Sequence, residues 1–381
     1  MYTTIYKNSL LCNPKTIEVF GIRIYNDIMK YSIYFFILFV CSTAHAQLGG
    51  TSVYEFVKIP YSARENALGG ECISLNDGDV SLALKNPSLL DTSYSYAFSG
   101  TWGGFHIAQT NIGAGSFACA YTVNPKVTAL AGIQFINYGR FFGYDEDGNY
   151  TGTFFGSDYQ IILGGSYQLH KHLYGGVSIK PILSYLESYS SYGLLGDIAL
   201  HYKRPEEFLS ISLIARNIGT QITSYTSQQK ESVPYSIDLG ITKRLQHAPL
   251  RFTISYLDIQ QFNLDYDNIL KQKTNLINQE QTSDDKLFTT IRVNTMKHLQ
   301  FSAELLLFKH IDFLLGYNYR NSEEMSFGAS KKGTGISAGA RIKTPFAHIS
   351  YGWSKQHVAG GLHFISLTTN IQTIVSKFTP L

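Results

Sequence analysis

The chain has 381 residues, a formal net charge of +3 and only 15% charged residues, whereas a soluble domain carries about 25%. Its mean hydropathy of −0.06 excludes a bundle of transmembrane helices, and the even spread of charge offers nothing basic enough to favour a nucleic-acid partner. A transmembrane β-barrel reconciles low charge with moderate hydropathy, because only alternate residues of its strands face lipid.

The chain begins with features of export. Residues 29–46 resemble a secretory signal peptide, with Lys30 ahead of an apolar run at 33–40 and the small-residue site Ala44-His45-Ala46 before Gln47. The apolar run is too short to cross a bilayer as a helix. We therefore expect residues 1–28 to be an upstream extension, and the mature protein to be exported to the outer membrane of a two-membrane bacterium.

Residues 47–92 differ from everything that follows them. They contain "PYSARENALGGECISLNDGDVSLALKNPSLL", which is rich in small residues and poor in β-branched ones. Ser62, Asn76 and Asp77 are candidate helix caps, and Pro87 is expected to end the segment before the first strand. A wide barrel is either an open channel or a plugged one. We expect this segment to be a partly helical plug that enters the lumen from the periplasm.

Arg64 lies in the predicted plug. If it lies in the lumen, it should pair with an acid such as Asp238 or Glu304, because an unpaired buried charge is costly. The alternative is a solvated arginine on a mobile segment outside the barrel.

After the plug, apolar and polar residues alternate in short runs. In "PYSIDLGITK", for example, Tyr235, Ile237, Leu239 and Ile241 share one face. The pattern predicts an all-β, 14-stranded antiparallel barrel over 93–369, followed by a C-terminal tail at 370–381. The expected strands are 94–100, 105–122, 127–139, 156–168, 172–184, 191–203, 208–217, 233–243, 250–259, 299–308, 311–320, 335–344, 346–354 and 359–369.

The connections between these strands separate by length. Short ones, such as "NPK" and "HKH", alternate with longer ones at 140–156, 217–232, 260–298 and 321–334. The exceptions on the outer side are the short "TWGG" and the modest "ESYSSY" and "SKQHVAG". Short periplasmic turns and longer outer loops are typical of such barrels. We expect the loop at 260–298 to carry a short amphipathic helix in "DYDNILKQKTNLINQ".

Charged residues on the inward faces carry both signs, which favours a lumen filled by protein over an ion-selective pore. The candidates are Lys180, Asp197, Lys203, Arg216, Asp238, Glu304, Arg320 and Arg341. Two cysteines remain in the mature chain. Cys72 and Cys119 could pair in an oxidising compartment, but Cys119 shares a face with Phe117 and Tyr121, which favours two free thiols.

Several motifs point weakly to chemistry. "GAGSFA" and "GTGISA" match a loose dinucleotide fingerprint but do not join a strand to a helix, so we interpret them as strand glycines. His170 and His172 offer two metal ligands without a third, and "DEDGN" at 145–149 lacks the spacing of a calcium loop. We expect no catalytic, cofactor or metal residues and no enzymatic activity, although a Ser–His pair distant in sequence stays open.

"SARENALGG" at 62–70, "DGD" at 77–79, "LKNPSLL" at 84–90 and "GYNYR" at 316–320 resemble the PorV/PorQ group. These are outer-membrane barrels of the type IX protein secretion system, distantly similar to FadL-type fatty-acid transporters. The resemblance covers about residues 50–369. The motif residues are Ser62, Arg64, Gly69, Gly70, Asp77, Asn86 and Pro87.

The resemblance implies a non-enzymatic anchor for a PorZ-like surface protein, within an attachment complex that includes PorU and PorV-like components. The outer loops would then bind the partner, and Tyr144, Asp145, Tyr150 and Tyr225 are the candidate residues. The alternative is a FadL-like carrier of hydrophobic small molecules. A carrier would need an apolar lumenal pocket and a side opening, for which Gly164-Gly165 or Gly175-Gly176 could supply a kink.

Overall fold

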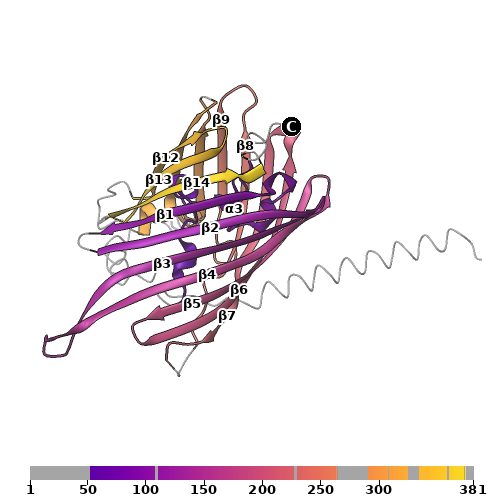
Figure 1. Ribbon diagram of the computed structural model, residues 1–381. Coiled ribbons are helices and arrows are strands. Elements are labelled where there is room, and N and C mark those ends of the chain that lie inside the picture. Colours follow the sequence, from indigo (N-terminus) through magenta and orange to yellow (C-terminus); the bar gives the residue numbers. More distant parts are fainter. Residues whose placement is uncertain are drawn as a thin grey trace, which may run out of the picture. The chain divides into compact units, whose positions relative to one another are not determined.

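The computed structural model describes residues 52–107, 110–226, 230–262, 264, 291–307, 309–324, 334–357, 360–372 and 374. Fourteen antiparallel strands pair in chain order, and the last strand pairs with the first, so that the sheet closes into a barrel (Figure 1). This confirms the predicted 14-stranded barrel. The proposed extension, the signal peptide and the helix in 265–279 lie outside the described residues.

The strands are β1 Ala97–Ile107, β2 Thr110–Asn124, β3 Val127–Tyr144, β4 Tyr150–His170, β5 Leu173–Leu186, β6 Tyr189–Arg204, β7 Leu209–Thr223, β8 Ser236–Arg244, β9 Leu250–Tyr256, β10 Leu299–Leu305, β11 Ile311–Asn318, β12 Ile336–Lys343, β13 Ala347–His357 and β14 Gly360–Asn370. A short 3-10 turn, η4 Pro205–Glu207, connects β6 to β7, and the helix α6 Tyr319–Glu324 follows β11.

Alternation along the strands separates an apolar outer face from a polar inner face. Trp102, Val123 and Ile179 are 66%, 60% and 59% exposed on the outer face, where lipid would cover them. Inward neighbours such as Ser178 and Asp197 are buried. Among the described residues, no helix is long and apolar enough to span a membrane.

Residues 53–96 fill the lumen as a plug of short helices. Its elements are η1 Glu55–Lys58, α2 Ala63–Ala67, α3 Val80–Ala83, η2 Pro87–Leu89 and η3 Thr92–Tyr94. The plug contacts strands around the whole ring, because α2 packs against β11–β14, α3 against β1 and β2, and η2 against β4–β6.

The structure corrects two of the predicted helix caps and the role of Pro87. Ser62 caps α2 as expected, since its hydroxyl accepts a hydrogen bond from the Glu65 amide. Asp79 caps α3, in place of the predicted Asn76 or Asp77. Pro87 starts η2 after the cap Asn86, and the plug continues to Tyr94, because proline suits the first position of a helical turn.

The first outer loop was also predicted wrongly. "TWGG" lies inside β1, which runs to Ile107. A side chain at Gly103 would lie 1.9 Å from the carbonyl oxygen of His363 in β14, so glycine here allows close strand pairing and does not mark a turn. The predicted loop at 140–156 is mostly strand as well, because β3 and β4 extend to Tyr144 and Tyr150.

The plug runs through the lumen in an unexpected direction. Ser52 forms a bridge with Ser232, in the long connection after β7, whereas β1 begins at Ala97 beside Asn370, at the end with the short turns. Since short turns mark the periplasmic end, the described chain starts at the outer end of the lumen and descends to the periplasmic end. Residues before 52 lie outside the described chain, so the expected entry from the periplasm stays a prediction.

Cys72 and Cys119 are free thiols, as the sequence favoured. Cys72 is buried in the plug, and Cys119 lies half-buried in the wall, where its thiol donates to the Ala131 carbonyl oxygen. They form no disulfide, because the wall strand presents Cys119 on the face that meets lipid.

Candidate functional site

The periplasmic half of the lumen is held together by ion pairs between plug and wall. Arg64 is fully buried, and its Nη2 lies 2.7 Å from Asp77 and 2.7 Å from Glu304 of β10. Arg251 of β9 contacts the same two acids, at 2.8 Å and 3.2 Å. The predicted pairing of Arg64 in the lumen is confirmed for Glu304, whereas Asp238 pairs elsewhere.

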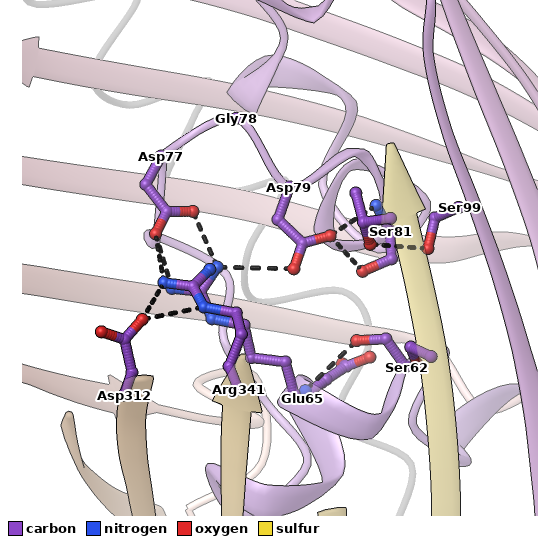
Figure 2. Close-up of polar contacts among 12 residues, drawn as sticks. Ser62, Glu65, Asp77, Gly78, Asp79, Ser81, Ser99, Asp312 and Arg341 are labelled. Atoms are coloured by element: carbon purple, nitrogen blue, oxygen red, sulfur yellow. Dashed lines mark hydrogen bonds and ion pairs between the residues drawn. The ribbon is translucent and has the colours of Figure 1, made fainter. Parts of the chain in front are cut away.

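Asp77 is the centre of this group. Figure 2 shows the carboxylates of Asp77 and Asp312 around the guanidinium of Arg341, which lies 3.5 Å from Asp77 and 2.6 Å from Asp312. Burial favours the protonated form of Asp77, but the charges of Arg64, Arg251 and Arg341 outweigh it, so the pKa of this carboxyl lies well below its usual value. Asp77 therefore stays ionised, pairs with Arg64 inside the plug and fixes the plug to Arg251 and Arg341 of the wall.

A second set of ion pairs crosses the middle of the lumen. Arg216 of β7 binds Asp238 at 2.5 Å and Glu71 of the plug at 2.8 Å. In the plug, Lys85 binds Glu65 at 2.6 Å. Within the wall, Lys180 pairs with Asp197, also at 2.6 Å.

The predicted lumen residues differ in their positions and in the groups that they contact. Lys203 reaches the plug at Asp91 over 2.8 Å, as an inward strand residue should. Arg320 does not line a strand as predicted, because β11 ends at Asn318. It lies in α6 at the outer end and pairs with Asp258 at 2.7 Å and Glu324 at 2.8 Å.

Glycines in the wall let the plug backbone touch the strands. A side chain at Gly352 of β13 would lie 1.8 Å from the carbonyl oxygen of Ala63, and one at Gly176 of β5 would lie 2.2 Å from the Ser88 amide. Of the predicted motif residues, Gly69 and Gly70 end α2 with φ of +97° and +102°, where glycine is favoured. Sequence patterns identify such glycines but do not reveal what they contact.

The outer half of the lumen has a different character, because it contains an apolar cluster. Strands β2, β3, β5, β6 and β14 supply the wall, and the first described residues of the plug fill the middle. We call this cluster the lumenal chamber. It comprises Val53, Tyr54, Phe56, Val57 and Ala63 of the plug, Val233 of the β7–β8 connection, and Ala114, Ile136, Ile182, Leu195, Leu362 and Phe364 of the wall. These side chains pack on one another and fill the chamber.

Beside the lumenal chamber, the wall has an irregularity. Strand β3 pairs with β2 only as far as Asn137, and its pairing with β4 jumps from Asn137 to Arg140. Tyr138 and Gly139 therefore lie outside the ladder, and Gly139 has φ of +80°. The Tyr138 hydroxyl donates to Asp158 of β4 over 2.6 Å. Gly164-Gly165, by contrast, stays in regular pairing.

A polar vestibule opens beside the plug at the outer end. This pocket of about 410 Å³ is lined by Lys58, Gly70, Arg216, Asn217, Asp258 and Arg320, among others. Its mixed charges suit water and polar groups, so an apolar molecule would gain little there until it reached the lumenal chamber.

The four candidate partner residues separate into two groups. Tyr144, Asp145 and Tyr150 lie exposed at the tip of the β3–β4 hairpin. Tyr225 instead points inward, shares a hydrogen bond with the Ser184 hydroxyl and packs against the lumenal chamber. Its place in a long outer loop suggested exposure, and the sequence carries no mark of its burial.

The weaker motifs have plain structural explanations. "GAGSFA" lies within β2, as expected of strand glycines. In "GTGISA" only residues 336–338 lie in β12, and Gly335 lies in the preceding turn with φ of +84°, so the interpretation as strand glycines is wrong for Gly335. Over the part of the chain that the structure describes, no group of three metal-ligating side chains comes together. His172 bonds through its ring to the Lys203 carbonyl oxygen, and Asp145 holds the turn at Asn149.

Comparison with known proteins supports the fold alone. No protein-family model matches the sequence. No curated protein matches it either. Among solved structures, the toluene transporter TbuX of Ralstonia pickettii superposes with a TM-score of 0.50 at 11% identity, covering 83% of this chain and 99% of that one.

Two further structures score slightly lower. The Pseudomonas putida toluene transporter TodX gives 0.48 at 12% identity, over 82% of this chain and 99% of that one. A Pseudomonas aeruginosa FadL homologue gives 0.47 at 8% identity, with the same coverage. Together with the closed, apolar-walled sheet, the match to TbuX shows that this chain has the plugged 14-stranded fold of an outer-membrane barrel.

Proposed function

We propose that the protein is a non-enzymatic outer-membrane carrier of hydrophobic small molecules. The lumenal chamber is the observation that carries this proposal, because an apolar molecule could replace the side chains of Val53, Tyr54, Phe56 and Val57 there. The fold shared with a toluene transporter adds support. Of the inward charges that favoured a different role, Lys203, Glu304 and Arg341 lie at the periplasmic end, away from the chamber.

The path of the molecule follows from what surrounds the chamber. It enters through the polar vestibule at the outer end and displaces residues 53–57. The ion pairs of Arg64 and Asp77 close the way towards the periplasm. We therefore place the exit sideways, at the bulge around Tyr138 and Gly139, where β2 no longer pairs with β3.

Binding of a fluorescent naphthyl dye to the purified full chain in detergent tests the carrier. We expect saturable binding that Ala114→Trp weakens at least tenfold, because Ala114 lines the lumenal chamber. The matched control is Ala129→Trp on the opposite, lipid-facing side of the neighbouring strand, which should leave binding unchanged. Phe56→Ala should strengthen binding by emptying part of the chamber. Equal binding by all variants would reject the carrier.

A second candidate function is an anchor for a surface protein in type IX secretion, as the resemblance to the PorV/PorQ group implies. The β3–β4 hairpin favours it, because it extends beyond the pairing with β2 and β5 and presents exposed apolar side chains there. The partners would be a PorZ-like surface protein with PorU and PorV-like components. Deleting the gene should release the PorZ-like protein from cells if the anchor is correct, and leave it attached if it is not.

A further inference from the structure

The outer end of the β3–β4 hairpin stands apart from the barrel. The pairing of β2 with β3 ends at Asn137, and that of β4 with β5 ends at Gly156. Residues 140–144 and 150–155 therefore pair in the sheet with each other, and the Glu187 amide bonds to the Phe155 carbonyl oxygen at the base of the ribbon. Figure 1 shows this hairpin extending past the neighbouring β5–β6 turn. From Gly156 to Tyr150 the ribbon spans about 20 Å.

One face of this ribbon is aromatic and exposed. Phe142, Tyr144, Tyr150 and Phe155 are 62%, 63%, 58% and 57% exposed. Tyr150 lies 6.3 Å from Phe142 and 6.0 Å from Tyr144, measured between ring centroids, so these rings form one patch. At its base, the guanidinium of Arg140 lies 5.8 Å from the Phe155 ring.

The other face explains how the ribbon keeps its shape. Phe141 and Phe154 stack there with ring centroids 5.1 Å apart and both half-buried. At the tip, the Asp145 carboxylate accepts hydrogen bonds from the amides of Asp147 and Asn149. The bond from Asn149 lowers the pKa of Asp145, so the tip is anionic at neutral pH. A two-stranded ribbon is marginally stable alone, and four large exposed side chains weigh against leaving it bare.

We propose that this aromatic ribbon is a docking surface for a cell-surface protein that covers it with an apolar groove bordered by basic residues. The net charge of the ribbon indicates the chemistry of its partner. Asp145, Glu146 and Asp147 are all exposed at the tip, and against the single base Arg140 they leave the ribbon with a net charge of −2. A basic border would complement this tip and speed association.

The same charge argues against two other occupants. A second copy of this chain would bring the acidic tips together, and like charges in contact oppose association. A ribbon lying on an anionic membrane surface would be expected to carry lysine and arginine, whereas this tip carries three acids. A protein with a basic groove is the occupant that both the rings and the charges fit.

Photo-crosslinking in intact cells tests the proposal. Benzoylphenylalanine at position 144 of the full chain should give an adduct with one surface protein, whereas the same group at the lipid-facing Tyr167 should not. Glu146→Lys with Asp147→Lys should reduce the adduct at least fivefold. Asp145 stays unchanged because it holds the turn. Heat-modifiable migration on gels checks that each variant is a folded barrel.

The crosslinked protein is then purified and titrated against wild-type barrel. We expect binding that weakens at least tenfold in the charge-reversed variant and in Tyr144→Ser with Tyr150→Ser. An adduct of twice the mass of this chain, an adduct with lipid alone, or an adduct insensitive to charge reversal would overturn the proposal.

The ribbon would give the second candidate function its contact surface and does not rest on the carrier. Dye binding by the charge-reversed variant should equal that of wild type. If no variant binds the dye, the carrier function is rejected and the proposed docking surface is unaffected. If the adduct contains a protein unrelated to type IX secretion, the docking surface is supported and the type IX anchor function is rejected.

Discussion

The guanidinium of Arg64 lies 2.7 Å from the carboxylate of Glu304, and this contact joins residues 240 positions apart in the chain. It connects the plug to strand β10 in a place where neither side chain meets solvent, since they are 0% and 2% exposed. The plug is thus fixed to the wall by charge as well as by packing.

Arg64→Met should destabilise the plug strongly. The substitution leaves the carboxylate of Glu304 buried with one cation fewer, and breaking a buried pair costs about 3–5 kcal/mol. The measurement is protease cleavage within residues 53–96 in urea, read as a free energy of opening. The control is Lys58→Met, whose pair with Glu55 is 53% and 50% exposed and should matter little. Equal effects of the two would contradict the role given to Arg64.

Gly352→Ala should loosen α2. Its new methyl group would lie 1.8 Å from the Ala63 carbonyl oxygen, which forces the helix off the wall, and overpacking of this kind costs about 1–3 kcal/mol. Gly100→Ala is the matched control, because nothing lies within 4 Å of the added carbon there. Thermal unfolding of both variants measures the difference, and an unchanged midpoint for Gly352→Ala would show that the contact is not maintained.

Acidification should release the periplasmic half of the plug. The pKa of Asp77 is lower in the folded protein than in the unfolded chain, where it is about 3.9. The stabilisation by Asp77 is therefore complete above about pH 4 and is lost as the pH falls through the folded pKa. Pepsin cleavage of the plug should rise below that pH. Asp77→Asn should raise pepsin cleavage at pH 4 and above. It should also remove the part of the pH dependence of cleavage that arises from this carboxyl.

The start of the plug should be accessible from outside the cell. Glu55 and Lys58 lie exposed at the outer end, whereas Lys126 lies in a short periplasmic turn. A cysteine at position 55 should react in intact cells with a maleimide that cannot cross the outer membrane. A cysteine at position 126 should react only after lysis. The reverse pattern would show that the plug runs the other way.

The sequence predicts the strands well because their signal is local. Alternation marks which side chains point outward, and loop length marks the two ends of the barrel. It failed at "TWGG" and at 140–156, where glycines and acids that suggest turns lie within or between paired strands. In both places the pairing partner decides the conformation, and a partner such as β14 is distant in sequence.

The site was less predictable because it depends on position along the lumen. Alternation identifies Ile136 and Ile182 as inward residues, yet nothing in their own strands places them at one level with Phe56. Likewise, Arg64 could be expected to seek an acid, but the choice of Glu304 over Asp238 is made by the register of the whole sheet.

The direction in which residues 53–96 run has a consequence for assembly. The pairing of β1 with β14 closes the barrel around the plug, which carries buried charges such as Arg64 and Lys85. If the plug moved along the lumen of a closed barrel, these buried charges would lose their partners during the movement, and unpaired buried charges are costly. We therefore expect residues 53–96 to be placed before β1 pairs with β14, so that this pairing completes the assembly of the barrel.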